Sequence, residues 1–125
     1  MSSLRLFLVE NHEDTSKYMR LFLEQLNYEI RVAGDMATAL REIPNSRYDV
    51  LISDIGLPDG DGWQLMEKLG PNRPPIAIAM SGYGTGNDRQ KSRAVGYSHH
   101  LIKPFTPDAL LAALRDAEEM RGKQR

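Results

Sequence analysis

Five short apolar runs, separated by segments with helical periodicity, limit how this chain can fold. Turn residues bound the runs, which is typical of buried strands. The runs are Leu4–Val9, Tyr28–Val32, Asp49–Ser53, Ile76–Met80 and His100–Ile102. Because strands that alternate with helices form parallel sheets covered on both faces, the pattern predicts an α/β fold.

The segments between the predicted strands have the apolar spacing of amphipathic helices. The first carries Met19, Phe22, Leu23 and Leu26, and it is expected to end near Asn27. Further helices are predicted over residues 36–43, before Pro44, over 63–69, over 87–95, and from 107 onward, where Thr106-Pro107 suits a helix start. We expect residues 1–125 to form one domain, with its core over 4–120 and a frayed tail over 121–125.

The composition excludes several classes of function. The 125 residues include no cysteine, which rules out disulfides, thiolate catalysis and cysteine zinc sites. The balance of 16 basic and 17 acidic residues gives no sign of direct nucleic-acid binding. No apolar run has membrane-spanning length, and the N-terminal run is too short for a signal peptide, so we expect a cytoplasmic protein without membrane insertion.

Polar side chains stand where four of the predicted strands end. They are Glu10 with Asn11, then Asp54, Ser81 and Lys103. Parallel strands end at a common edge, so these side chains are expected to converge there. Carboxylate and amide oxygens suit Mg²⁺, an aspartate can become an acyl phosphate, and a lysine with a hydroxyl can bind phosphoryl oxygens.

These residues resemble the motifs of response regulator receiver domains, and the resemblance spans roughly residues 4–120. The matching motifs are the acidic pair Glu10-Asn11, the phosphoacceptor motif at residues 54–62, the switch motif Ser81-Gly82 and the motif Lys103-Pro104. The Gly-Leu-Pro-Asp-Gly run at residues 56–60 and the residue His100 are similar to those of receivers attached to hybrid sensor histidine kinases. The resemblance implies a doubly wound (βα)5 sheet with the flavodoxin-like strand order 2-1-3-4-5.

The resemblance also implies a role in a two-component phosphorelay. Asp54 would accept a phosphoryl group from a phosphohistidine of a histidine kinase or phosphotransfer domain, with Lys103 pairing with Asp54 and then with the phosphate. The reaction would depend on Mg²⁺ or Mn²⁺, held by Glu10, Asn11, Asp54 and the backbone carbonyl of Gly56. The domain would be a phosphoacceptor and not an enzyme.

A conformational switch is part of the same expectation. Ser81 would bond the phosphoryl group and His100 would turn inward. The change would alter the surface of the fourth helix, fifth strand and fifth helix, over residues 87–120, which could also form a homodimer. His100 stands where Tyr or Phe is commoner, and a histidine there could make switching depend on pH.

Two smaller features follow from the resemblance. The peptide bond between Lys103 and Pro104 is expected to be cis. Gly56 and Tyr83 stand two residues after the phosphoacceptor and the switch serine. The residues at those two positions are expected to tune the rate of dephosphorylation.

Asn11 is the main departure from the family's pattern, because an aspartate that binds the metal directly is usual there. An amide oxygen can ligate Mg²⁺ but carries no charge, so we expect weaker Mg²⁺ binding, tightened by Asn11→Asp. Glu13 or Asp14 could compensate, although both are expected at the start of the first helix, and His12 is expected to be a loop residue and not a ligand. The alternative function is a pseudo-receiver that binds proteins without phosphorylation.

Two enzyme classes also fit the sequence less well. Phosphatases of the haloacid-dehalogenase type carry a second aspartate two residues after the nucleophile, where this chain has Gly56. A P-loop is excluded because the chain has no Gly-Lys-Ser/Thr motif. The phosphoacceptor therefore remains the leading interpretation.

Overall fold

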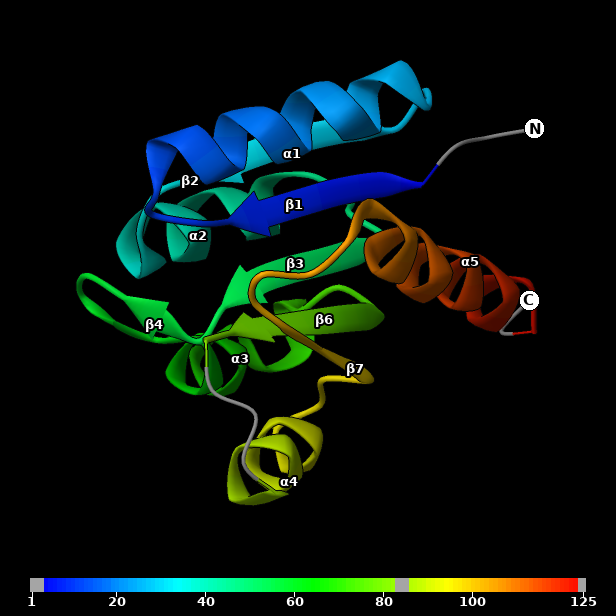
Figure 1. Cartoon of the computed structure of the whole chain (residues 1–125). Coiled ribbons are helices and arrows are strands. Elements are labelled where there is room, and N and C mark those ends of the chain that lie inside the picture. Colours follow the sequence, from blue (N-terminus) through cyan, green and yellow to red (C-terminus); the bar gives the residue numbers. More distant parts are fainter. Residues whose placement is uncertain (1–3, 83–85, 124–125) are drawn as a thin grey trace.

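A five-stranded parallel sheet forms the centre of the computed structural model, which describes residues 4–82 and 86–123 (Figure 1). The strands are β1 (Arg5–Val9), β2 (Glu29–Ala33), β3 (Val50–Asp54), β6 (Ile76–Ser81) and β7 (His99–Ile102). They lie in the order β2-β1-β3-β6-β7, with every neighbouring pair parallel. Counted along the chain, this order is 2-1-3-4-5, so the predicted doubly wound fold is confirmed.

Helices connect the strands and cover both faces of the sheet. They are α1 (Glu13–Gln25), α2 (Met36–Glu42), α3 (Gly62–Leu69), α4 (Gly86–Ala94) and α5 (Pro107–Lys123), with short 3₁₀ helices η1 (Ile43–Asn45) and η2 (Gly70–Asn72). Helices α1 and α5 pack on one face, and α2 and α3 pack on the other (Figure 1). Within the described residues, no helix is both long and apolar enough to cross a membrane.

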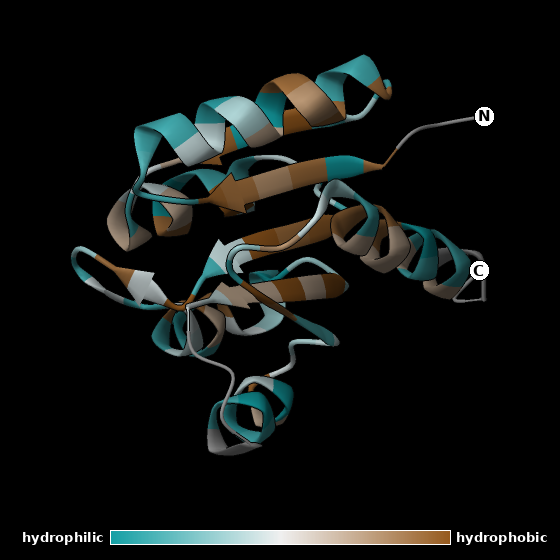
Figure 2. Cartoon of the chain, in the orientation of Figure 1, coloured by the Kyte–Doolittle hydropathy of each residue, from teal (hydrophilic) through white to brown (hydrophobic). Residues whose placement is uncertain are grey.

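Alternation along the strands divides the core into two apolar layers. In β1, Phe7 and Val9 join the layer beneath α2 and α3, whereas Leu6 and Leu8 join the layer beneath α1 and α5. Successive strand side chains point to opposite faces, so strands buried on both sides need apolar residues at every position. Figure 2 shows this: the central strands are mostly hydrophobic, and the helices carry polar residues on their outer sides.

Three details differ from the sequence-based expectations. Leu26 follows the end of α1 and is 42% exposed, because the chain reverses at Asn27 with a φ of 68°. A small antiparallel hairpin of β4 (Gly56–Leu57) and β5 (Gly60–Asp61) occupies residues 56–61, a segment whose Gly, Pro and Asp content is typical of a loop. Helix α5 continues to Lys123, past the expected core boundary at residue 120.

Candidate functional site

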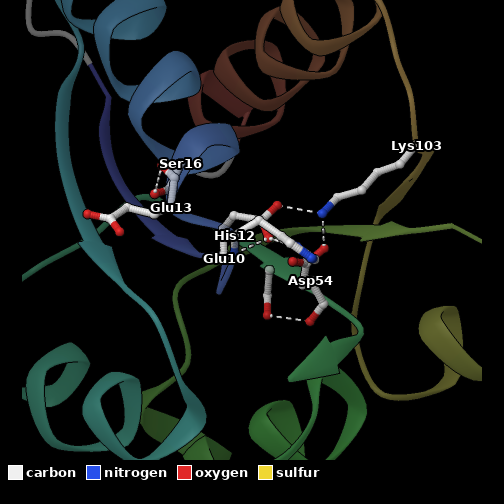
Figure 3. A network of polar contacts seen from close by, with 7 residues as sticks. Glu10, His12, Glu13, Ser16, Asp54 and Lys103 are labelled. Carbon is white, nitrogen blue, oxygen red and sulfur yellow. Dashed lines mark hydrogen bonds and ion pairs between the residues drawn. The ribbon is translucent and has the colours of Figure 1, made fainter. Parts of the chain in front are cut away.

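Four of the predicted site residues lie at the carboxyl edge of the sheet. Asp54 ends β3, Ser81 ends β6, and Glu10 and Lys103 directly follow β1 and β7. Because parallel strands end at one edge, residues 93 positions apart in the sequence meet there. Figure 3 shows Glu10, Asp54 and Lys103 directed toward one another. The peptide bond between Lys103 and Pro104 is cis, the isomer that the resemblance implies.

A single ammonium group lies between two buried carboxylates. The Nζ atom of Lys103 is 2.5 Å from Oε1 of Glu10 and 2.6 Å from Oδ1 of Asp54. The side chain of Glu10 is fully buried and that of Asp54 is 6% exposed, whereas that of Lys103 is 24% exposed. The two acids carry more negative charge than one lysine balances, so this arrangement favours a further cation.

The two carboxyl groups titrate as a coupled pair. Burial, together with the neighbouring Glu10 carboxyl, raises the pKa of Asp54 to about 7, although Lys103 acts in the opposite direction. Burial also tends to raise the pKa of Glu10, but hydrogen bonds with Asp54, Lys103 and the His12 amide hold it below its usual value. The opposite shifts in the pKa values of Asp54 and Glu10 therefore belong to one coupled pair, whose protonation changes together beside the lysine.

His12 brings an imidazole ring to the same carboxylates. It is the N-cap residue of α1, and its backbone N–H donates to Oε2 of Glu10 at 3.1 Å. Its Nδ1 atom lies 3.3 Å from the same oxygen. Ligand atoms of Glu10, His12 and Asp54 all lie within 4.8 Å of one another. The loop position of His12 was predicted, but this approach to two buried carboxylates depends on strands that are distant in the sequence.

The remaining predicted ligands stand on the exposed side of the site. Asn11 is exposed in the turn after β1, and Gly56 begins β4. Glu13 and Asp14 occupy the first turn of α1, as predicted, and both are exposed. In Figure 3, the Glu13 carboxylate points away from Asp54. Metal binding by the Asn11 side chain and the Gly56 carbonyl stays a prediction.

Ser81 and His100, the predicted switch pair, are in contact. The distance between Oγ of Ser81 and Nε2 of His100 is 2.7 Å. Among the described residues, His100 Nδ1 is a buried side-chain nitrogen without a hydrogen-bond partner. Burial lowers the pKa of His100, so the ring is neutral at pH 7. The other residue assigned to rate tuning, Tyr83, lies outside the described residues.

Two aspartates in the β4–β5 hairpin fix the helices beside the site. Asp59 accepts hydrogen bonds from the backbone N–H groups of Met36 at 2.8 Å and Ala37 at 2.9 Å, at the start of α2. Asp61 forms a capping box with Gln64 at the start of α3. Aspartates in a segment rich in Gly and Pro are typical turn formers, but here both side chains also bind the start of a helix. The Asp-x-x-Gln spacing is itself a capping-box signal, whereas nothing local to Asp59 indicates a partner 23 residues away.

Comparison with known proteins gives a consistent family. The family model described as the response regulator receiver domain matches residues 6–115. The chain is 27% identical over 118 residues to the sensor protein EvgS of Escherichia coli strain K12, covering 94% of this chain and 10% of EvgS. It is 28% identical over 112 residues to the transcriptional activator protein IrlR of Burkholderia pseudomallei strain 1026b, covering 90% of this chain and 49% of IrlR. The chain therefore spans half or less of the length of these relatives.

Solved structures share the fold along almost the whole chain. A CheY-like response regulator receiver domain protein from Methanospirillum hungatei JF-1 superposes with a TM-score of 0.92 at 26% identity, covering 99% of this chain and 100% of that one. The receiver domain of the sensor histidine kinase PA1611 from Pseudomonas aeruginosa PAO1 has a TM-score of 0.81 at 24% identity, covering 92% and 97% of the two chains. That structure is described with a magnesium ion coordinated in its active-site cleft.

Proposed function

Because this chain belongs to the response regulator receiver domain family, we propose that it is the phosphoacceptor of a two-component phosphorelay and that Asp54 takes the phosphoryl group. The observation that carries the proposal is the Asp54 carboxylate, held 2.6 Å from the Lys103 ammonium beside the buried Glu10. A structural ion pair would need one acid for one lysine. A second buried acid is costly for stability, and costly buried charges are typical of functional sites.

The proposed transfer uses a phosphohistidine of a histidine kinase or phosphotransfer domain as donor. A carboxylate oxygen of Asp54 forms a bond to phosphorus while the phosphorus–nitrogen bond breaks, and the departing imidazole takes up a proton. The Lys103 ammonium lies at hydrogen-bonding distance from Oδ1 of Asp54. It can therefore pair with the carboxylate before transfer and with the phosphoryl oxygens after transfer. In this proposal the domain accepts the phosphoryl group, and the partner that donates it is the kinase or phosphotransfer domain.

The donor set at the site fits a divalent cation. Glu10 and Asp54 supply carboxylate oxygens, and the resemblance adds the Asn11 side chain and the Gly56 backbone carbonyl. Mg²⁺ and Mn²⁺ prefer such oxygen ligands. When bound, the ion would neutralise charge on the transferred phosphoryl oxygens.

The proposed output is a shift between two arrangements of the switch pair. Ser81 Oγ is now bonded to His100, and a phosphoryl group on Asp54 would compete for that hydroxyl. Such competition favours one conformation of the surface formed by α4, β7 and α5. That surface would contact the downstream partner or a second copy of the domain. A cytoplasmic location belongs to the same proposal, because the family's phosphohistidine donors act there.

The test is the intact mass after incubation with acetyl phosphate, with and without Mg²⁺. Wild type should gain one phosphoryl group only with Mg²⁺, and Asp54→Asn should gain none. Asp59→Asn, a matched change in the β4–β5 hairpin that follows, should behave as wild type. Circular dichroism should show that all three proteins are folded. A folded wild type that gains no mass would overturn the proposal and favour the alternative, a protein-binding module that needs no phosphate.

A further inference from the structure

An imidazole nitrogen lies beside the two carboxylates that would hold the cation of this site. The side chain of His12 is 72% exposed, and its Nδ1 atom lies 3.3 Å from Oε2 of Glu10. Figure 3 shows His12 beside Glu10 and Asp54. Ligand atoms of the three side chains lie within 4.8 Å of one another, so a small movement of the exposed His12 ring would bring all three to bonding distance of one ion.

The donor chemistry of these three residues differs from an all-oxygen set. Mg²⁺ prefers oxygen ligands, whereas imidazole suits first-row transition metals such as Co²⁺, Ni²⁺ and Zn²⁺. Asn11, the neighbouring residue, contributes no negative charge. With an amide at Asn11, the site therefore has one carboxylate fewer than is usual for the family, and it has an imidazole within reach.

We propose that His12 is a direct ligand of a divalent transition-metal ion, together with Glu10 and Asp54, and that it shifts the selectivity of the site away from Mg²⁺ toward this class. The proposal rests on the proposed function only in placing the cation at the Asp54 site. That His12 is a ligand is inferred from its distance to Glu10 and Asp54, and the class of metal is inferred from its imidazole nitrogen.

The surroundings of His12 allow it to bind a metal without repacking the core. Its ring is largely exposed, so a small rotation about the side-chain bonds costs little. Glu10 is fixed on its other oxygen by Lys103, which leaves Oε2 directed toward the ring. The other two histidines are engaged elsewhere, His99 with Asp116 at 3.2 Å and His100 with Ser81.

The first measurement is metal affinity, with Co²⁺ and Mg²⁺ as the probes. The metal-free full chain, His12→Ala and His99→Ala would each be titrated with each ion by calorimetry. Changes in residues outside the direct ligand shell already weaken metal binding by about tenfold to a hundredfold, so His12→Ala should lose at least about tenfold in Co²⁺ affinity. Its Mg²⁺ affinity should change by less than about threefold. His99→Ala is the matched control, and both of its affinities should equal those of wild type.

The second measurement identifies the ligand atom directly. Proton NMR of the Co²⁺-loaded wild type should show a strongly shifted imidazole N–H signal, which should be absent from His12→Ala and present in His99→Ala. Unchanged Co²⁺ affinity in His12→Ala, an equal loss for both ions, or a shifted signal that survives the substitution would each overturn the inference.

The acetyl phosphate assay separates this inference from the proposed function. A Mg²⁺-dependent mass gain together with Co²⁺ binding that does not depend on His12 would support Asp54 as the phosphoacceptor and overturn His12 as a metal ligand. Co²⁺ binding that depends on His12, without any mass gain, would support His12 as a metal ligand and overturn Asp54 as the phosphoacceptor.

Discussion

Replacing Asp54 by Asn should stabilise the protein at pH 8, although it removes the proposed phosphoacceptor. The pKa of Asp54 is raised to about 7 because the carboxyl is buried beside Glu10, so ionising it opposes folding. The folded protein then binds more protons than the unfolded chain, whose Asp titrates near 3.8, and stability falls as the pH rises from about 4 to above 7. An Asn side chain still accepts the hydrogen bond from Lys103 and has no charge to bury.

The size of this gain in the free energy of unfolding follows from the raised pKa of Asp54. A rise in pKa from 3.8 to about 7 corresponds to an upper limit of about 4 kcal/mol. Solvent and salt reach the open side of the site, where the Lys103 side chain is 24% exposed, so we expect about 1–3 kcal/mol at pH 8. The gain should vanish near pH 4, where Asp54 of the folded wild type is protonated.

Urea denaturation followed by circular dichroism, in buffers free of divalent cations, measures this difference at pH 8 and at pH 4.5. The control is Asp14→Asn, which removes an equal charge from an exposed position in the first turn of α1. That change should cost at most about 1 kcal/mol through the helix dipole. An Asp54→Asn variant that is less stable than wild type at pH 8, or equally stabilised at both pH values, would refute the reasoning.

Three further predictions concern the supports of the site. Asp61→Ala removes the capping box of α3 and should lower the free energy of unfolding by about 1 kcal/mol in urea denaturation; no loss would mean that the cap is unimportant. Gly62→Ala would place a Cβ 2.6 Å from the backbone oxygen of Asp54 and should cost about 1–3 kcal/mol in the same assay, whereas Gly56→Ala, whose Cβ meets nothing within 4 Å, should cost less. The pKa of His100 is lowered in the folded protein, so as the pH falls the histidine of the unfolded chain, with an ordinary pKa of 6.5, is protonated first. Wild type should therefore lose stability as the pH falls below about 6.5. His100→Phe should lose less stability between pH 7.5 and 5.5, and an identical pH dependence of the two unfolding free energies would contradict this.

The amino-acid sequence by itself determined the succession of strands and helices along the chain and the edge of the sheet where polar residues meet. Short apolar runs predicted strands because burial on both faces requires apolar residues at every position, as Leu6 and Phe7 show in β1. The carboxyl ends of those runs located Glu10, Asp54 and Lys103, because parallel strands end at one edge. The capping box of Asp61 was also readable, since its partner stands only three residues away.

Only the tertiary structure decided how these residues share charge and which neighbours join them. The Lys103 ammonium lies between two carboxylates of different strands, so the opposite pKa shifts of Glu10 and Asp54 depend on burial and on distances that no local pattern encodes. The same holds for Asp59, which caps a helix 23 residues earlier in the chain, and for His12, whose ring meets Glu10 and Asp54. Hydrophobic periodicity specifies which face of an element is buried, whereas contacts between distant strand ends arise only when the sheet has assembled.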